Sequence, residues 1–191
     1  MKVIGFTGNY DMEESIPQGY LMADSSLLFT GRPFFVPDFA QGFVVTPTIA
    51  VKTGRLGKCI APRFAHRYWD ALTAAFTVRA IDSDNPRLLA LDRAFDGSAV
   101  MGDWLAVEGL DDPMHEVVEM MIDDVVVARH CLADMRWPLD DMIAAVSSRC
   151  SIKMGDVILT GETAPARAIA PGNHLTATIS GRQVLNVKVR L

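Results

Sequence analysis

The segment Phe43–Lys58, FVVTPTIAVKTGRLGK, constrains the fold of this chain more than any other stretch. Its β-branched residues favour a strand, which ends in a turn at the glycines of TGRLGK and is interrupted by Pro47. Side chains two positions apart in a strand lie on the same face, so Thr46 and Thr48 project to one side. That shared face either packs in the core or belongs to a binding site.

Hydrophobic periodicity and turn residues predict the remaining elements. Predicted strands lie at 2–8, at an edge segment with two prolines at 31–39, in a hairpin at 117–130 that turns at Asp123-Asp124, at 157–160, and in a terminal hairpin that turns at Ser180-Gly181. Predicted helices lie at 138–149 and at 63–76, where Phe64, Tyr68, Trp69, Leu72 and Phe76 follow helical spacing. Strands predominate, which indicates a strand-rich α+β fold.

Length and composition limit the classes of protein to consider. The chain has 191 residues, half of them hydrophobic, which predicts one domain over 1–191 with a sizeable core. Acidic residues outnumber basic ones by 23 to 18 and no basic stripe exists, which argues against nucleic-acid binding. Cys59, Cys131 and Cys150 are far apart and odd in number, which favours free thiols in a reducing compartment. The N-terminal segment turns polar early, so neither a signal peptide nor a membrane span is predicted, and a cytoplasmic location is expected.

An acidic cluster with a central histidine lies between Asp111 and Asp124. On a helix, His115 and Glu119 would share a face and could hold a metal ion. The surrounding residues favour strands, however, and the HEVVE string lacks the second histidine of a zinc-protease motif. A solvated loop and turn is therefore the preferred interpretation.

Several segments, taken in order along the chain, resemble the fumarylacetoacetate hydrolase family. KMGDVILTGE and PGNHLTATISGRQVLNVKV resemble its C-terminal signature, and RAFDGSAVMGDWLAVE resembles its Lys-x-Phe-Asp-x-x-x-x-x-Gly-x-Trp stretch. GFTGNYDMEE resembles its opening Asn-Tyr loop, and RPFFVPDF with RLGKCIAPRFAHRYWDALTAAF resembles the region of its acidic strand. The resemblance covers nearly the whole chain. It implies a mixed β-roll like the C-terminal domain of that family, and a homodimer.

The resemblance also implies a metal chemistry that this chain lacks the ligands for. Members of the family hold Mg²⁺ or Mn²⁺ with carboxylates, and the ion polarises dicarbonyl substrates such as acylpyruvates. The positions of the two glutamates in the family's Glu-x-Glu strand are occupied here by Thr46 and Thr48, and the position of the third carboxylate lies near Thr77. Asp82 and Asp84 lie close to this last position, so its register stays open. Because hydroxyls are neutral and poor ligands for a hard dication, no metal cofactor is expected.

Other positions that the resemblance assigns to the substrate cavity are also changed. The position of the family's candidate base is occupied by Glu13 or its neighbour Glu14. The lysine of Lys-x-Phe-Asp is replaced by Arg93, and the first threonine of the TGT-Pro signature is replaced by Glu162. The implied substrate contacts are Tyr10, in the Asn-Tyr loop, and Thr163. The turn glycines and core aromatics of the family pattern are retained.

Three functional hypotheses remain open. The first, which is the favoured one, is a family member without metal catalysis, a dimeric scaffold that binds a partner or a small ligand such as an oxo acid. The second is a hydrolase or isomerase of small oxo acids in which Glu13, Glu162 and Arg93 perform acid–base chemistry. The third holds Mg²⁺ or Mn²⁺ with displaced ligands, namely Asp82, Asp84 or the acids at 111–124. Under each hypothesis, the threonines can also be explained without a functional role, because β-branched residues are favoured in strands.

Overall fold

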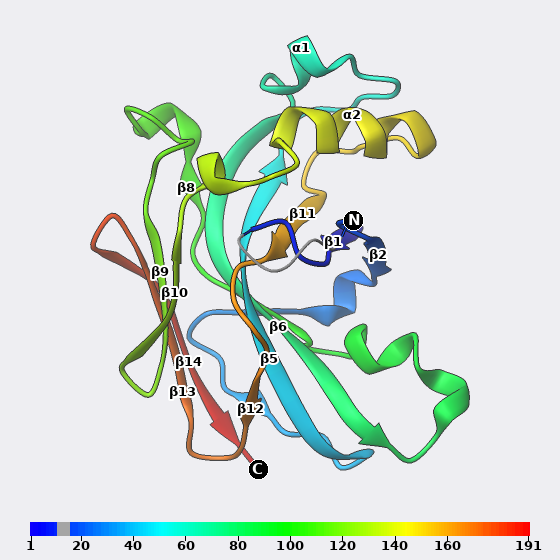
Figure 1. Ribbon diagram of the computed structural model, residues 1–191, viewed down its shortest axis with the longest axis vertical. Helices are drawn as coiled ribbons and strands as arrows, with labels where there is room; N and C mark the ends of the chain where they lie inside the picture. Colours follow the sequence, from blue (N-terminus) through cyan, green and yellow to red (C-terminus); the bar gives the residue numbers. More distant parts are fainter. Residues whose placement is uncertain (11–15) are drawn as a thin grey trace.

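The computed structural model describes residues 1–10 and 16–191, and for residues 82 and 83 it describes the backbone alone. Within these residues, a nine-stranded and a five-stranded sheet curl around a common core (Figure 1). The strands are β1 (Val3–Phe6), β2 (Gly19–Met22), β3 (Leu27–Phe29), β4 (Phe34–Phe35), β5 (Ala40–Thr53), β6 (Trp69–Ser83), β7 (Ala99–Met101), β8 (Leu105–Ala106), β9 (Val118–Ile122), β10 (Val125–His130), β11 (Val157–Glu162), β12 (Arg167–Ile169), β13 (His174–Ile179) and β14 (Arg182–Arg190). The α-helices are α1 (Pro62–Ala65) and α2 (Leu139–Arg149), and the 3₁₀ turns are η1 (Asp24–Ser26), η2 (Pro86–Leu88), η3 (Leu91–Arg93), η4 (Val107–Gly109) and η5 (Leu132–Asp134).

The nine-stranded sheet is built on two long neighbouring strands, β5 and β6. They pair antiparallel from Ala40 opposite Ser83 to Thr53 opposite Trp69. On one side of this pair, β11 joins β5, β1 joins β11 in parallel, and β2 forms the edge. On the other side, β7 joins β6 and β3 joins β7 in parallel. Parallel and antiparallel pairs thus share one curled sheet, which confirms the predicted strand-rich mixed β-roll.

The five-stranded sheet contains both predicted hairpins, in the order β10-β9-β13-β14-β4. Asp123 and Asp124 have φ angles of 49° and 63°, and Ser180 and Gly181 have 47° and 83°. Positive φ at both central residues is the conformation that tight two-residue hairpins favour. β4 pairs with β14 at the edge of the sheet, so the edge strand predicted from its flanking prolines is confirmed.

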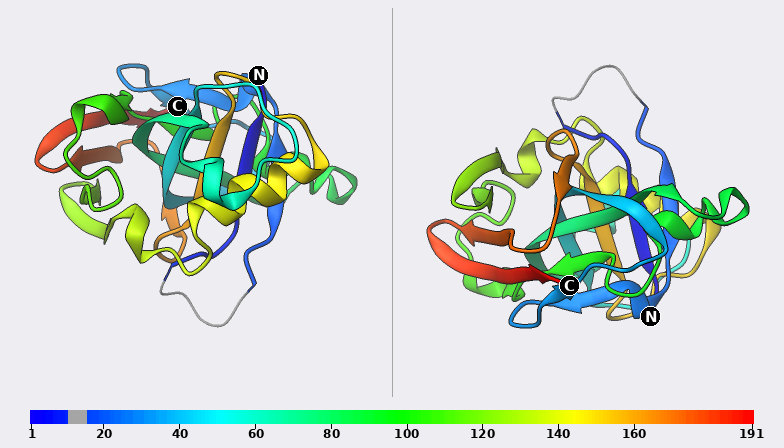
Figure 2. Two further views of the ribbon diagram at one scale, coloured as in Figure 1. Left: turned by 90° about the horizontal axis from the view of Figure 1, so that it is seen from above. Right: turned by 90° about the horizontal axis from the view of Figure 1, so that it is seen from below.

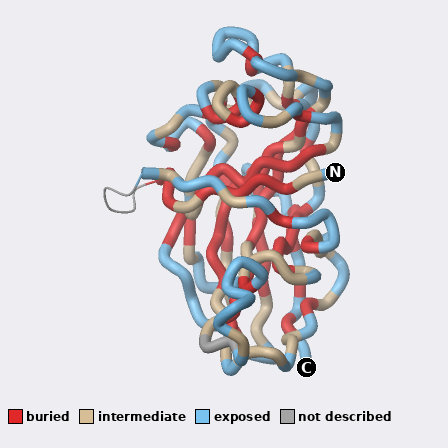
Figure 3. The backbone as a smooth tube through the Cα atoms, turned by 90° about the vertical axis from the view of Figure 1, so that its right-hand side faces the viewer, coloured by how far each residue is buried: buried red, intermediate tan, exposed pale blue. Residues whose placement is uncertain are grey.

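The main core lies between the two sheets and α2. This helix lies across one end of the long strands, as the views from above and below also show (Figure 2). It buries Leu139, Met142 and Ile143, which confirms the apolar face predicted for 138–149. The buried stretches run through the middle of the sheets and the inner side of α2, while the connecting loops are exposed (Figure 3). A second, smaller cluster of buried residues covers the other face of the nine-stranded sheet.

The prediction of a helix at 63–76 is wrong for most of that range. α1 ends at Ala65 after a single turn, and β6 begins at Trp69. Every residue from Ala71 to Phe76 is buried, because both faces of this part of the sheet are covered. A strand that is buried on both faces shows no alternation, so its apolar residues can match helical spacing by chance. Pairing with β5 along the strand outweighs the local helical preference.

Two further sequence-based expectations concern single features. Cys59, Cys131 and Cys150 are free, as their spacing predicted. Within the described residues, no helix has the length and apolar character needed to cross a membrane.

Candidate functional site

The three threonines lie together on one face of the nine-stranded sheet. Thr46 of β5 is directly opposite Thr77 of β6, and Thr48 is opposite Ala75. The buried side chains of this face are small or aliphatic, and the partly buried rings of Tyr20 and Trp104 pack against them. The buried ones are Val3, Met22, Ala50, Ala75, Ala99, Met101, Val157 and Leu159. The structure therefore brings together the positions that the resemblance assigned to the metal ligands.

The hydroxyl groups of Thr77 and Thr48 donate hydrogen bonds within the sheet. Thr77 Oγ1 donates to the Thr46 carbonyl at 3.4 Å, and Thr48 Oγ1 donates to the Ile49 carbonyl at 3.3 Å. Thr46 and Thr48 are 7% and 2% exposed, so little of either side chain meets solvent. These threonines therefore add uncharged polar groups to the site and no charge.

A β-bulge in β11 carries Glu162 to the same face. Leu159 pairs with Ala50 and Glu162 pairs with Thr48, so β11 takes three residue steps where β5 takes two. The extra step includes Gly161, whose φ angle is 132°. Because side chains alternate along a regular strand, a β11 without the bulge would direct Glu162 toward the main core.

Arg93 reaches this face from η3, which packs against β6. Its Nη1 lies 3.9 Å from Glu162 Oε1, and the two side chains are 31% and 25% exposed. The guanidinium carbon also lies 4.8 Å from the centre of the Tyr20 ring, within the range of a cation–π contact. Two of the predicted catalytic residues, Arg93 and Glu162, are thus brought together beside the threonines.

Tyr20 is part of this site, and the sequence analysis missed it. Its ring lies across Gly5, where a Cβ atom would be 2.2 Å from the ring carbon Cζ. The Arg93 guanidinium carbon lies 4.8 Å from the centre of this ring. Burial raises the pKa of the Tyr20 hydroxyl, and the Arg93 guanidinium offsets part of the rise, so the phenol is neutral at neutral pH. A glycine inside a strand often marks a place where another group approaches the backbone closely. Gly5 was therefore the sequence signal that could have pointed to a ring at this position.

The two implied substrate contacts have structural partners. Tyr10 is fully buried in the main core, and its hydroxyl lies 2.8 Å from Thr160 Oγ1. Thr160 donates its own proton to the Ile49 carbonyl, so Tyr10 is the donor to Thr160. Thr163 is 4% exposed, and its N–H and hydroxyl both donate to the Pro47 carbonyl, at 2.9 and 3.0 Å.

The remaining acidic candidates do not form a second site in the described part of the chain. Glu13 lies outside the described residues, as does the side chain of Asp82. Asp84 is exposed. The acids at 111–124 bond to separate neighbours: Asp112 to His115, Glu116 to Ser180, Glu119 to Arg129, and Asp123 to Asn173 and His174. This cluster is the loop and turn that the sequence favoured.

The residues of the candidate site do not fit a hard dication. Its ligand positions hold neutral hydroxyls, and Glu162, the one carboxylate that the described residues place on this face, lies beside the positive Arg93. Among the side chains that the structure describes, which exclude those of residues 11–15, 82 and 83, no three from histidine, cysteine, aspartate or glutamate are grouped closely enough to bind a metal ion. Mg²⁺ and Mn²⁺ prefer several carboxylate oxygens, which this arrangement does not supply.

Comparison with known families gives a match over residues 7–190, to the family described as fumarylacetoacetate (FAA) hydrolase C-terminal. The chain belongs to the FAA hydrolase family. The resemblance drawn from the sequence motifs is thereby confirmed, and it extends over almost the whole length of the chain.

Relatives of this FAA hydrolase family member include hydrolases and isomerases. It is 28% identical over 93 residues to oxaloacetate tautomerase YcgM of Escherichia coli (strain K12), an alignment that covers 48% of this chain and 42% of that protein. The structure of fumarylpyruvate hydrolase from Pseudomonas aeruginosa in complex with Mn²⁺ and pyruvate superposes with a TM-score of 0.88 at 18% identity, over 100% of this chain and 90% of that one. The structure of 5-carboxymethyl-2-hydroxymuconate delta-isomerase from Mycobacterium smegmatis superposes with a TM-score of 0.85 at 22% identity, over 99% of this chain and 78% of that one. These two likenesses establish the shared fold.

Proposed function

We propose that this chain is an FAA hydrolase family protein that binds a small oxo acid through Arg93 and lacks the catalytic dication. The observation that carries the proposal is the position of Thr46, Thr48 and Thr77 on one face, with Arg93 and Glu162 beside them. As a metal-dependent hydrolase or isomerase, such a protein is impaired.

Electrostatics support the absence of a tightly bound dication. Three carboxylates would supply three negative charges, whereas three hydroxyls supply none. Disturbing even an outer-shell partner of a metal ligand costs about 10–100-fold in metal affinity, and replacing the ligands themselves costs more. The Arg93 guanidinium adds a like charge that repels the ion.

Arg93 has the properties of an anion-binding residue. It is about one-third exposed, and its distance of 3.9 Å from Glu162 is longer than a hydrogen bond. A guanidinium offers five N–H donors in a plane and binds carboxylates through two parallel hydrogen bonds. Donors therefore remain for a ligand carboxylate, while Tyr20 supports the face of the guanidinium. Pyruvate is the natural probe, because the hydrolase from Pseudomonas aeruginosa holds Mn²⁺ and pyruvate.

The test is a calorimetric titration of pyruvate and oxaloacetate into the protein in the presence of EDTA. Both ligands are expected to bind, and Arg93→Ala is expected to weaken binding by about tenfold or more, because it removes charge-assisted hydrogen bonds. Arg129→Ala is the matched control, since Arg129 is 68% exposed on β10, in the other sheet. Unchanged affinity in Arg93→Ala would refute the assigned role of Arg93.

A second candidate function is metal-free proton transfer by Glu162. The contact between Glu162 and Arg93 favours it, because a base beside a cation that holds the substrate can move a proton to or from the carbon next to a carbonyl. Oxaloacetate tautomerisation, followed by the absorbance of the enol in EDTA, is the assay. Glu162→Gln is expected to remove any protein-dependent rate that is present, and a rate that this variant retains would exclude Glu162 as the base.

A further inference from the structure

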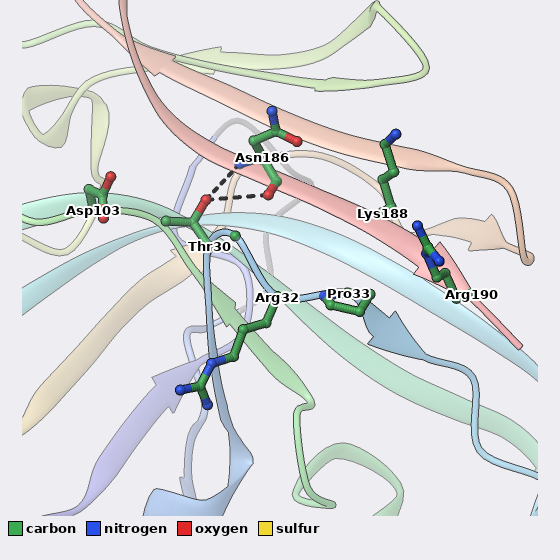
Figure 4. Close-up of a pocket in the computed structure, with 8 residues that line it drawn as sticks. Thr30, Arg32, Pro33, Asp103, Asn186, Lys188 and Arg190 are labelled. Carbon is green, nitrogen blue, oxygen red and sulfur yellow. Dashed lines mark hydrogen bonds between the residues drawn. The ribbon is translucent and has the colours of Figure 1, made fainter.

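A second candidate site lies on the outer face of β14, in a cavity of about 570 Å³. The cavity is lined by the loop 30–33, by Asp103 and by three alternate residues of β14, namely Asn186, Lys188 and Arg190 (Figure 4). It shares no residue with the threonine face. Its volume is typical of sites that bind small molecules.

Hydrogen bonds to the backbone of β14 hold both walls of the cavity against this strand. Thr30 Oγ1 accepts the Asn186 N–H at 2.9 Å, and the Gly31 N–H donates to the Asn186 carbonyl at 3.2 Å. On the other wall, the Asp103 N–H donates to the Val184 carbonyl at 2.7 Å. These bonds hold the backbone of both walls against the sheet, so the shape of the cavity is set before a ligand arrives.

The charged side chains that line the cavity are separated by sign. Lys188 and Arg190 alternate with the buried Val187 and Val189, so both cations lie on the outer face at one end of the cavity. Asp103 lies at the other end in Figure 4, with Thr30 and Asn186 between them. Arg32 also lines the cavity, although its side chain extends away from Lys188 and Arg190 in this view.

These cations are not neutralised by the protein. Neither Lys188 nor Arg190 forms an ion pair with any described residue, in a chain whose net charge is −5. Two neighbouring cations without carboxylate partners repel each other, and a dianionic group would relieve that repulsion. A phosphate carries about −1.5 to −2 charges at neutral pH and offers three acceptor oxygens, which suits a lysine and an arginine together.

We propose that this cavity binds a small phosphorylated polyol, with its phosphate on Lys188 and Arg190 and its hydroxyls toward Asp103 and Asn186. The Asp103 carboxylate can accept hydrogen bonds from a polyol, and the Asn186 amide nitrogen can donate them, since the amide oxygen of Asn186 already lies 2.8 Å from His174 Nε2. Among the described residues that line the cavity no aromatic ring occurs, so nothing stacks on a nucleobase. The ligand is therefore a hydroxylated phosphate without an aromatic group.

The experiment is a calorimetric titration with glucose 6-phosphate, glucuronate and glucose at low ionic strength. Glucose 6-phosphate is expected to bind, glucuronate to bind at least about threefold more weakly because it carries one charge, and glucose not to bind measurably. The double variant Lys188→Gln/Arg190→Gln is expected to weaken glucose 6-phosphate binding by about tenfold or more, and added salt to weaken binding in the wild-type protein.

Two matched controls separate this site from general surface charge and from the threonine face. Arg182→Gln removes an exposed cation from the start of β14, outside the cavity, and is expected to leave the affinity unchanged. Arg93→Ala is expected to have no effect on glucose 6-phosphate either. No binding of glucose 6-phosphate, equal binding of glucuronate, or equal affinity in the double variant and in Arg182→Gln would overturn the proposal.

Discussion

Gly161→Ala is expected to lower the free energy of unfolding by about 3 kcal/mol and to displace Glu162 from the candidate site. The φ angle of Gly161 is 132°, and a Cβ atom there would lie 2.5 Å from Asn9 Cβ. Asn9 cannot easily move away, because it is fully buried and bonded to Trp137 and Thr160. The measurement is chemical denaturation of the variant and the wild-type protein.

Gly172→Ala is the control that separates backbone strain from steric overlap. Gly172 also has a positive φ, of 106°, but a Cβ atom there meets nothing within 4 Å. We expect a loss of about 1 to 2 kcal/mol for this variant. Equal losses at the two glycines would contradict the view that β11 must pass close to Asn9 to form the bulge.

Asp156→Ala is expected to cost about 3 kcal/mol of unfolding free energy, because it removes a buried acceptor that serves two backbone N–H groups and the Lys2 ammonium. Asp156 is 1% exposed and accepts the N–H groups of Lys2 at 2.9 Å and Lys153 at 2.7 Å, in addition to its ion pair with the Lys2 ammonium. These contacts attach β1 to the start of β11. The matched control is Asp24→Ala, since Asp24 is 62% exposed and 3.9 Å from the N-terminal amine.

The same carboxylate gives a pH dependence of stability. Burial raises the pKa of Asp156, but the Lys2 ammonium and the N–H donors outweigh it, so the pKa lies below its ordinary value. A depressed pKa in the folded state stabilises the protein above the ordinary aspartate pKa of about 3.9. That stabilisation is lost as the pH falls through the lower, folded-state pKa. The difference between wild type and Asp156→Ala should therefore shrink below about pH 4, and a constant difference from pH 7 to pH 3 would contradict this assignment.

Most of the fold could be predicted from the sequence, and the failures have physical causes. The hairpin at Asp123-Asp124 was predictable because its turn chemistry is local. The strand at Trp69–Ser83 was not, because burial on both faces removes the alternation that identifies strands. The homodimer, the cytoplasmic location and the single domain over 1–191 remain predictions.

The candidate site was predictable only where motifs carried it. Arg93, Glu162 and the three threonines followed from collinear motifs, and the structure places them on one face. Tyr20 carries no motif, and its role depends on the pairing of β1 with β2, which sets its ring over Gly5. The bulge at Gly161 was equally hidden, because the register of β11 on β5 is a tertiary property.

The most direct test of the proposed function is a titration of Mn²⁺ followed by electron paramagnetic resonance. A variant with Thr46→Glu, Thr48→Glu and Thr77→Asp serves as the positive control, and it is expected to gain one saturable site. For the wild-type protein we predict no saturable Mn²⁺ binding up to about 1 mM, and no Mn²⁺-dependent turnover of oxaloacetate or acylpyruvates. One Mn²⁺ bound per wild-type chain at micromolar concentration, and lost when the three threonines are replaced by alanine, would contradict the account.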